Sequence, residues 1–359
     1  MRIRRALALI LAVLIALGGG YAGYSAVRSQ RPVSLAPSGP FAVGRTVSEW
    51  RDLSRDSRPL SVWLWYPVKT GVSGSAAAPY APGDWSHLHK FGIGQTAFGR
   101  IKTGTLLEAP IADGVFPVVV LLPGMGFSAP QYATIAASLA ARGYVVAGVT
   151  PTYSANVTVL DGHLVTASAD GDPSTLTADK ADKLVEVWAG DALFAARQVA
   201  AAYQDHVDAR HILYIGHSFG GAASLEACRQ DASCAGAADL DGTPYGPVVA
   251  SGLRKPLLLL SSGNDGAATD PSTRLLFHAS KGSSHAYTIP DARHFDFTDY
   301  AAYYLAAPLR LLLPLGGLDG RRVLTITSGY LGAFADSAAR GSPWTAPTYP
   351  EIRPVEMLG

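Results

Sequence analysis

The chain has 359 residues, of which 48% are hydrophobic and 16% are charged, and its formal net charge is +1. This composition excludes a disordered or collagen-like protein. The Lys and Arg residues are scattered along the chain, which excludes the basic stripe that a nucleic-acid partner requires. We therefore expect a globular protein that binds no nucleic acid, and its near-neutral charge suits uncharged or lipid-like substrates.

The N-terminus has the pattern of a targeting segment. Arg2, Arg4 and Arg5 precede an uncharged stretch, Ala6–Val27. A basic segment followed by an apolar run is typical of export signals, and 22 uncharged residues are also enough to cross a bilayer. We expect residues 1–30 to be a signal peptide or an N-terminal membrane anchor. Residues 31–359 should then form a single domain outside the cytoplasm, with any membrane association through the N-terminal segment.

The first half of the chain changes from polar segments to regular elements. Residues 28–59 are polar and contain proline, which predicts a linker into the early strands. The pattern then predicts a strand at 61–68, a long loop at 69–100, a buried strand at 117–122, a helix at 130–142, a strand at 144–149, a loop or hairpin at 152–177 and a helix at 178–204. We expect 69–100 and 152–177 to shape the substrate pocket.

The second half continues this alternation. It predicts strands at 211–215, 235–240, 256–261 and 285–289, a helix ending near 229, and helices at 272–280, 299–313 and 320–339. Strands that alternate with helices indicate an α/β fold with a mainly parallel, doubly wound sheet flanked by helices.

Cysteine and histidine usage gives no metal-site pattern. Cys228 and Cys234 have five residues between them, and an exported protein would let them form a disulfide. No other ligand cluster has the spacing of a zinc site. His87 and His89 form an isolated pair that we expect to be exposed to solvent. We expect no metal and no organic cofactor.

The motif that carries chemistry is Gly216-His217-Ser218-Phe219-Gly220. It follows a predicted strand and opens a predicted helix, which is the context of the nucleophile elbow in α/β-hydrolases. Glycines two residues on either side of Ser218 permit the sharp turn that exposes its hydroxyl. Ser218 is therefore the predicted nucleophile, and the fold is predicted to be that of an α/β-hydrolase.

A serine hydroxyl needs a positioned base, which in this fold comes last in chain order. His294 follows the last predicted strand and is our candidate for the base. His278 and His285 fall in a predicted helix and at a strand start, where surface or packing roles are expected.

Two aspartates end strands between the nucleophile and the base. Asp241 follows one strand and Asp265 follows the next. Either could accept the second imidazole N–H and fix the histidine tautomer. The residues alone leave this choice open.

The turn after the strand at 117–122 has two interpretations. The N–H groups of Met125 and Phe219 are placed in sequence to form an oxyanion hole. Gly124-Met125-Gly126-Phe127-Ser128-Ala129 also fits a dinucleotide-binding fingerprint. That fingerprint requires an acid at the end of the next strand, and Val149-Thr150-Pro151 has none. The sequence therefore favours the oxyanion hole.

Four segments together resemble the platelet-activating factor acetylhydrolase family, of the plasma and intracellular type II kind, in its bacterial branch. These are the hexapeptide Gly216–Gly221, the pair Leu240-Asp241, the run His294–Asp299, and the strand at 117–120 that leads to Gly124–Gly126. The likeness extends loosely over residues 43–339. It implies that Asp241 is the acid, and that short or oxidised acyl chains of phospholipids are hydrolysed without calcium.

Other functions remain open at this level. Asn264-Asp265 also resembles the acid region of bacterial cutinases and polyester hydrolases. An acyltransferase would use the same three residues and pass the acyl group to an alcohol. A non-catalytic envelope binding protein on a hydrolase fold is the alternative of another class, although a binder has no need of the triad. We therefore expect a small-molecule or lipid ester as substrate.

Overall fold

The computed structural model describes residues 2–69, 74–90, 94–263, 266–304 and 313–357. In this part of the chain the strands are β1 (Val33–Ser34), β2 (Ala42–Asp52), β3 (Arg58–Val68), β4 (Ile101–Lys102), β5 (Thr105–Leu107), β6 (Phe116–Leu122), β7 (Val145–Thr150), β8 (Thr158–Leu160), β9 (His163–Val165), β10 (Val207–His217), β11 (Cys234–Leu240), β12 (Leu257–Ser262), β13 (Ser284–Ile289) and β14 (Arg353–Pro354).

The α-helices are α1 (Arg2–Ser29), α2 (Ala133–Ala141), α3 (Ala178–Ala202), α4 (Phe219–Gln230), α5 (Val248–Ser251), α6 (Pro271–Ala279), α7 (Tyr300–Tyr303) and α8 (Gly320–Arg340). Short 3-10 helices are η1 (Gly83–Leu88), η3 (Phe98–Arg100), η4 (Ala129–Tyr132), η5 (Pro173–Thr175), η6 (Ala267–Thr269) and η7 (His294–Phe297).

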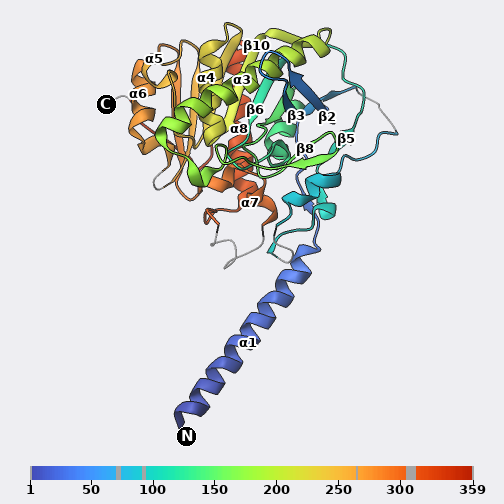
Figure 1. Cartoon of the computed structure of the whole chain (residues 1–359), viewed down its shortest axis with the longest axis vertical. Helices are drawn as coiled ribbons and strands as arrows, with labels where there is room; N and C mark the ends of the chain where they lie inside the picture. The colour runs from blue at the N-terminus through green and yellow to red at the C-terminus, as the bar shows by residue number, and fades with distance from the viewer. Residues whose placement is uncertain (1, 70–73, 91–93, 264–265, 305–312, 358–359) are drawn as a thin grey trace.

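A large sheet forms the centre of the molecule (Figure 1). Its strand order is β14-β13-β12-β11-β10-β6-β7-β3-β2-β5. The six strands from β13 to β7 run parallel, whereas β3 is antiparallel to both of its neighbours and β14 is antiparallel to β13. The predicted α/β class and mainly parallel sheet are confirmed.

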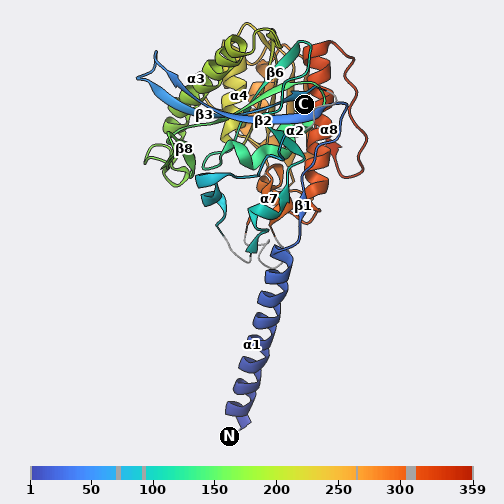
Figure 2. The ribbon, with the colours of Figure 1, turned by 90° about the vertical axis from the view of Figure 1, so that its right-hand side faces the viewer.

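Helices cover both faces of the sheet, as Figure 2 shows for α3 and α4 on one side and α2 and α8 on the other. Each face has its own hydrophobic core. Trp63, Leu121 and Phe334 belong to the core under α2 and α8, and Leu122 and Trp188 to the core under α3 and α4. Parallel strands buried on both faces are rich in apolar residues, as the run Val118–Leu122 is. These two cores fix the carboxyl edge of the sheet, where the chemistry-bearing loops begin.

The prediction of a linker over 28–59 is wrong for most of its length. β2 occupies 42–52 and pairs antiparallel with β3 along its full length. The polar residues of this segment suggested a linker, but they include Arg45, which is buried in β2. The guanidinium of Arg45 lies 4.5 Å from the ring centroid of Trp63 and donates to the carbonyl of Pro79. Only contacts from distant segments make that position acceptable for a charge.

Most other elements lie where they were predicted, but the short strands β1, β4, β5 and β14 were not predicted. The predicted hairpin within 152–177 is formed by β8 and β9. Of the predicted helix at 299–313, only α7 (Tyr300–Tyr303) is helical before the backbone becomes extended at Tyr304, and residues 305–312 lie outside the described residues. Cys228 and Cys234 are joined by a disulfide, which ties the end of α4 to the start of β11.

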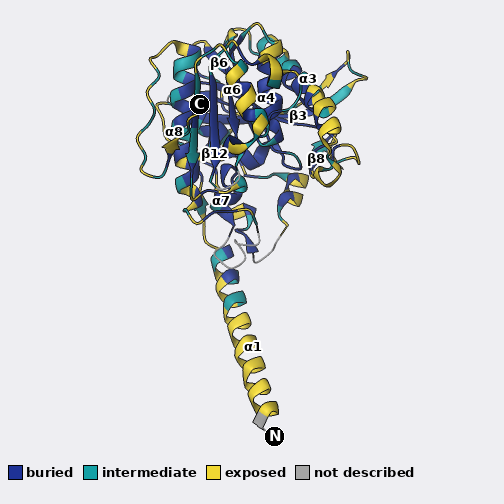
Figure 3. Ribbon diagram, turned by 90° about the vertical axis from the view of Figure 1, so that its left-hand side faces the viewer, coloured by how far each residue is buried: buried dark blue, intermediate teal, exposed yellow. Residues whose placement is uncertain are grey.

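The helix α1 projects from the body and stays exposed along most of its length (Figure 3). The stretch Ile3–Ser29 has a mean hydropathy of 2.1 in its most apolar window, none of which is buried in the protein. An exposed apolar helix of this length is compatible with a signal peptide or a membrane anchor.

Candidate active site

Ser218 occupies a strained turn between β10 and α4. Its φ of 56° lies in the left-handed region, which is uncommon for a residue other than glycine. A Cβ on Gly216 would collide with the backbone of Gly220, and a Cβ on Gly220 would collide with the carbonyl of Pro123. The Ser218 N–H donates to the carbonyl of Leu240 at 2.8 Å, which ties the turn to β11. The turn therefore depends on both glycines and places the serine hydroxyl at the carboxyl edge of the sheet.

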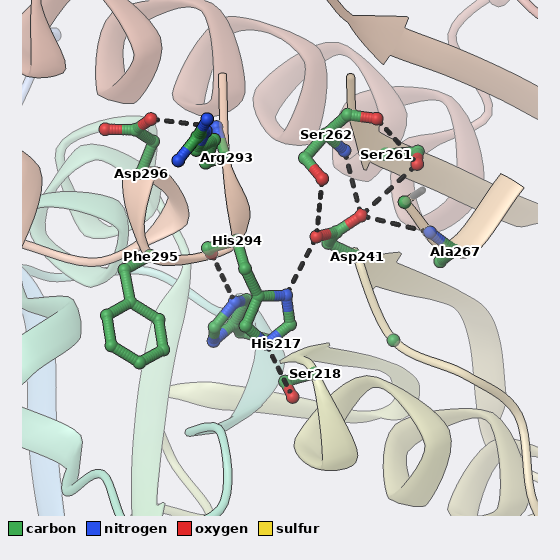
Figure 4. Close-up of polar contacts among 12 residues, drawn as sticks. His217, Ser218, Asp241, Ser261, Ser262, Ala267, Arg293, His294, Phe295 and Asp296 are labelled. Carbon is green, nitrogen blue, oxygen red and sulfur yellow. Dashed lines mark hydrogen bonds and ion pairs between the residues drawn. The ribbon is translucent and has the colours of Figure 1, made fainter. Parts of the chain in front are cut away.

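His294 reaches the same edge from the loop after β13. Its Nε2 lies 2.9 Å from the Ser218 Oγ (Figure 4). The loop is held by the Asp296 carboxylate, which accepts the N–H groups of Arg293 at 2.9 Å and Gly316 at 2.6 Å. The His294 side chain keeps 34% of its surface exposed. It is therefore held by its backbone and remains open to a substrate.

Asp241 supports the other side of the imidazole. Its Oδ2 lies 2.8 Å from the His294 Nδ1. The same carboxylate accepts the Ser262 N–H at 2.9 Å and hydroxyl at 2.8 Å, the Ser261 hydroxyl at 3.2 Å and the Ala267 N–H at 3.2 Å. The structure thus brings Asp241 to His294. The alternative residue, Asp265, lies outside the described residues.

The donors around Asp241 set its charge. Burial acts to raise the pKa of this carboxyl, but the hydrogen bonds from His294 and Ser262 and the charge of His294 outweigh it and lower the pKa to about 2. Asp241 is therefore ionised at neutral pH and stabilises a positive charge on His294 when one develops.

Ser218, Asp241 and His294 border a cavity of about 340 Å³ whose walls are mostly apolar. Phe127 and Phe295 form one wall, with ring centroids 5.0 Å apart. Phe219 and Tyr245 form another, with centroids 5.8 Å apart. The remaining lining comes from the loops after β6, β10, β11 and β13 and from the predicted pocket segment 152–177, namely Gly124, Met125, Pro173, Leu176, His217, Ser218, Asp241, Thr243 and His294. Among the described residues of 69–100, none lines this cavity, and that half of the pocket prediction stays a prediction.

Met125 and Phe219, the two residues predicted to form an oxyanion hole, lie beside Ser218 and line the cavity. Met125 follows Gly124, where a Cβ would lie only 3.3 Å from the Ser218 Cβ, so the turn after β6 closely approaches the serine. Within the described residues, the Met125 N–H has no protein acceptor. Phe219 begins α4, and the first N–H groups of a helix have no intrahelical partner. These two positions therefore agree with the geometry that an oxyanion hole requires, which stays a prediction.

The remaining histidine predictions are mixed. His278 is exposed on α6, and His285 stacks on Trp344 with ring centroids 4.7 Å apart, which agrees with the predicted surface and packing roles. His87 is exposed as expected. His89 is half-buried against Phe98, so the prediction of exposure is wrong there. Among the described residues, no group of three or more His, Cys, Asp and Glu side chains could hold a metal ion.

Two serines that hydrogen-bond Asp241 were not predicted from the sequence. Ser261 and Ser262 end β12, next to β11 in the sheet. The carboxyl ends of neighbouring parallel strands meet at one edge of the sheet. Two hydroxyl residues at the end of β12 could therefore have indicated hydrogen bonds to an aspartate at the end of β11. The packing of His217 was missed as well, although the residue lies inside the quoted hexapeptide.

Comparisons with known proteins find esterases. The sequence model of the family described as platelet-activating factor acetylhydrolase, isoform II, matches residues 192–330, a range that contains Ser218, Asp241 and His294. A probable 1-alkyl-2-acetylglycerophosphocholine esterase from Arthroderma benhamiae is 26% identical over 336 residues, covering 82% of this chain and 84% of the relative. The solved structure of a ferulic acid esterase from Streptomyces cinnamoneus has a TM-score of 0.78 and 27% identity, covering 90% of this chain and 99% of that one.

Proposed function

We propose a catalytic route for this chain, a serine ester hydrolase that resembles the platelet-activating factor acetylhydrolase family. Ser218 acts as the nucleophile, His294 as the general base and Asp241 as the acid that orients the base. The observation that carries this assignment is the continuous pair of hydrogen bonds from Asp241 through His294 to Ser218, of 2.8 and 2.9 Å, beside an apolar cavity.

Acylation begins when the Ser218 Oγ attacks the ester carbonyl carbon. His294 Nε2 takes the hydroxyl proton, and ionised Asp241 stabilises the resulting imidazolium. The N–H groups of Met125 and Phe219 donate to the oxyanion of the tetrahedral intermediate. His294 then returns the proton to the leaving alkoxide, and the acyl group stays on Ser218.

Deacylation repeats these roles with water as the nucleophile. His294 takes a proton from the water as it attacks the acyl carbon, and then protonates the Ser218 Oγ as the acid departs. The products are a carboxylic acid and an alcohol, and the route requires no metal or organic cofactor.

The cavity suits an ester with one small or flat acyl group and an apolar remainder. A volume of about 340 Å³ holds a short acyl chain and part of the alcohol, and leaves long alkyl chains outside. The Arthroderma relative is named for an acetylglycerophosphocholine ester, which has a short acyl group of this kind. The aromatic walls formed by Phe127 and Phe295 favour a second candidate, an aromatic acyl ester, in line with the name of the Streptomyces relative.

The exposed helix α1 supports an exported location. We infer that residues 31–359 form one domain, which α1 directs across the membrane or anchors at its outer face. The apolar length of α1 and its lack of burial against the protein support this inference.

One labelling experiment tests both proposals. Cells expressing the full chain are fractionated and treated with a fluorophosphonate, and the labelled peptide is identified by mass spectrometry. Wild type and Ser174→Ala, which alters an exposed serine near the cavity, should be labelled on Ser218, whereas Ser218→Ala should not. Label in the membrane fraction on a chain of full mass indicates an anchor, and label outside the cells on a shortened chain indicates cleavage.

Turnover of three esters completes the test. The three esters are nitrophenyl acetate, an acetylated ether phospholipid and ethyl ferulate. For each ester that the wild type hydrolyses, Ser218→Ala should lower kcat by at least about 10⁴-fold. Near-wild-type turnover in Ser218→Ala would contradict the assignment of the nucleophile. Label confined to the cytoplasm would contradict the inferred location.

A further inference from the structure

A buried chain of hydrogen bonds runs behind Ser218 and connects two loops of the site. The Gly124 N–H donates to the Tyr132 hydroxyl at 2.8 Å. That hydroxyl lies 2.8 Å from the His217 Nδ1, and the His217 Nε2 lies 2.9 Å from the carbonyl oxygen of His294. The chain therefore links the turn after β6, the end of η4, the residue before Ser218 and the loop after β13.

The chemistry of these groups fixes the direction of every bond. The His294 carbonyl can only accept, so the His217 Nε2 carries the proton. Burial, followed by the nearby charge of His294, lowers the pKa of His217 to about 3, so its ring stays neutral and its Nδ1 is an acceptor. The hydroxyl of Tyr132 therefore donates to Nδ1, and its oxygen accepts the Gly124 N–H. Burial raises the pKa of Tyr132 well above 10, which keeps this donor protonated.

The two ends of this chain are the two loops on which the proposed reaction depends. Gly124 directly precedes Met125, which lines the cavity, and the other end is the backbone of His294 itself. The contacts leave little freedom, because a Cβ at Gly124 would lie 2.9 Å from the His217 Nδ1. The rings of His217 and His294 have centroids 4.6 Å apart, and both His217 and Tyr132 are buried.

We propose that His217 and Tyr132 are positioning residues, which hold the turn after β6 and the His294 loop in their places around Ser218. The turn after β6 carries Met125, the predicted oxyanion donor. This inference rests on the proposed function. A shift of either loop would misplace a donor that acts only when negative charge develops on the substrate oxygen. The loss should therefore fall on the transition state and leave substrate binding unchanged.

A purely structural role for these residues has different consequences. Buried hydrogen bonds of any kind add to stability, and their loss lowers the folded fraction. A lower folded fraction does not weaken the affinity for a tetrahedral adduct more than the affinity for a planar ligand. The property to measure is therefore the difference between these two losses of affinity.

Tyr132→Phe removes one hydroxyl and keeps the ring. Its matched control is Tyr144→Phe, because Tyr144 is also buried and its hydroxyl donates to Asp336 at 2.7 Å, outside the cavity lining. For each variant we would measure kcat and KM on a nitrophenyl ester, normalised by fluorophosphonate titration of active protein. We would also measure inhibition by a boronic acid, whose boron accepts the Ser218 Oγ to form a tetrahedral adduct, and by an unreactive amide of the same shape.

Tyr132→Phe should lower kcat about 10- to 100-fold per active molecule and weaken boronic acid inhibition by a similar factor. KM and inhibition by the amide should stay within about twofold. Tyr144→Phe should leave all four quantities within about twofold. Equal effects in the two variants, or a loss confined to KM, would overturn the inference while leaving the proposed function in place.

A second variant tests whether the hydrogen bonds act as one chain. His217→Phe removes both bonds of the imidazole, so its loss should at least equal that of Tyr132→Phe, and the double variant should lose no more than His217→Phe alone. If the loss in the double variant equalled the product of the two single losses, the hydrogen bonds would not act as one chain. A wild-type protein that neither labels at Ser218 nor hydrolyses esters would overturn the proposed function and this inference together.

Discussion

Two aspartates at the end of β11, Asp239 and Asp241, lie two residues apart and differ in their charge. Burial raises the pKa of Asp239 well above its ordinary value, and its environment offers little compensation. Its Oδ1 accepts the Gly242 N–H at 2.8 Å, and its Oδ2 has no partner among the described residues. Asp241 is also buried, and donors from Ser261, Ser262, Ala267 and His294 converge on it. The hydrogen bonds from His294 and Ser262 and the charge of His294 outweigh burial and lower its pKa to about 2.

This difference shows that burial alone does not decide the charge of a carboxyl group. The number of donors aimed at it decides whether the ionised form survives away from water. In this protein the ionised carboxylate faces His294, and the neutral one lies against the backbone of Gly221 and Gly242. The predictions below test this contrast in order of decreasing effect on turnover.

Exchanging each aspartate for asparagine should give opposite results. Asp241→Asn presents a donor to the His294 Nδ1, which leaves the proton on Nε2 and removes the acceptor for Ser218. The expected loss in kcat is about 10³- to 10⁴-fold. Asp239→Asn imitates a protonated acid and should retain kcat within about threefold. Steady-state kinetics on the two variants would contradict the comparison if Asp239→Asn proved equally damaging.

Removing one donor from Asp241 should weaken its charge only in part. Ser262→Ala deletes the 2.8 Å hydroxyl bond to Oδ2, the same oxygen that faces His294. The pKa of Asp241 should rise toward its ordinary value, and kcat/KM should fall about threefold to tenfold because the other donors remain. The control is Ser280→Ala, whose hydroxyl makes two comparable bonds at the end of α6. Similar losses in both variants would show that the effect does not depend on Asp241.

A third buried carboxyl group, that of Asp299, tests the comparison through the free energy of unfolding. No change in kcat is expected when it is replaced. Burial raises the pKa of Asp299 to about 7, although Tyr80 and the Thr134 N–H donate to it at 3.2 Å. The folded protein therefore holds a proton that the unfolded chain releases above pH 3.8. Stability from this group is fully present below pH 3.8 and is lost as the pH rises to about 7.

Asp299→Asn should remove this pH dependence. Relative to wild type, the free energy of unfolding of the variant should increase between pH 4 and pH 7 by up to about 4 kcal/mol. Urea unfolding at several pH values measures that difference. A difference that does not change with pH would contradict the raised pKa.

The site shows how far local patterns carry. The glycines around Ser218 and the position of His294 after the last parallel strand were readable because a sharp turn has local steric requirements. The choice between Asp241 and Asp265 was not readable from the residues, since both follow strands. In the structure Asp241 contacts His294, and Asp265 lies outside the described residues.

The alternation of strands and helices, the parallel core and the turn that carries Ser218 follow from local features of the amino-acid sequence. These features depend on hydrophobic periodicity and on glycine, which act over a few residues. The folded chain was needed to show that Arg45 lies buried against Trp63 within a strand, that Ser262 stabilises the charge of Asp241, and that His217 connects two distant loops. Each of these depends on groups that the fold brings together from separate parts of the chain, and their separation in sequence leaves no local pattern.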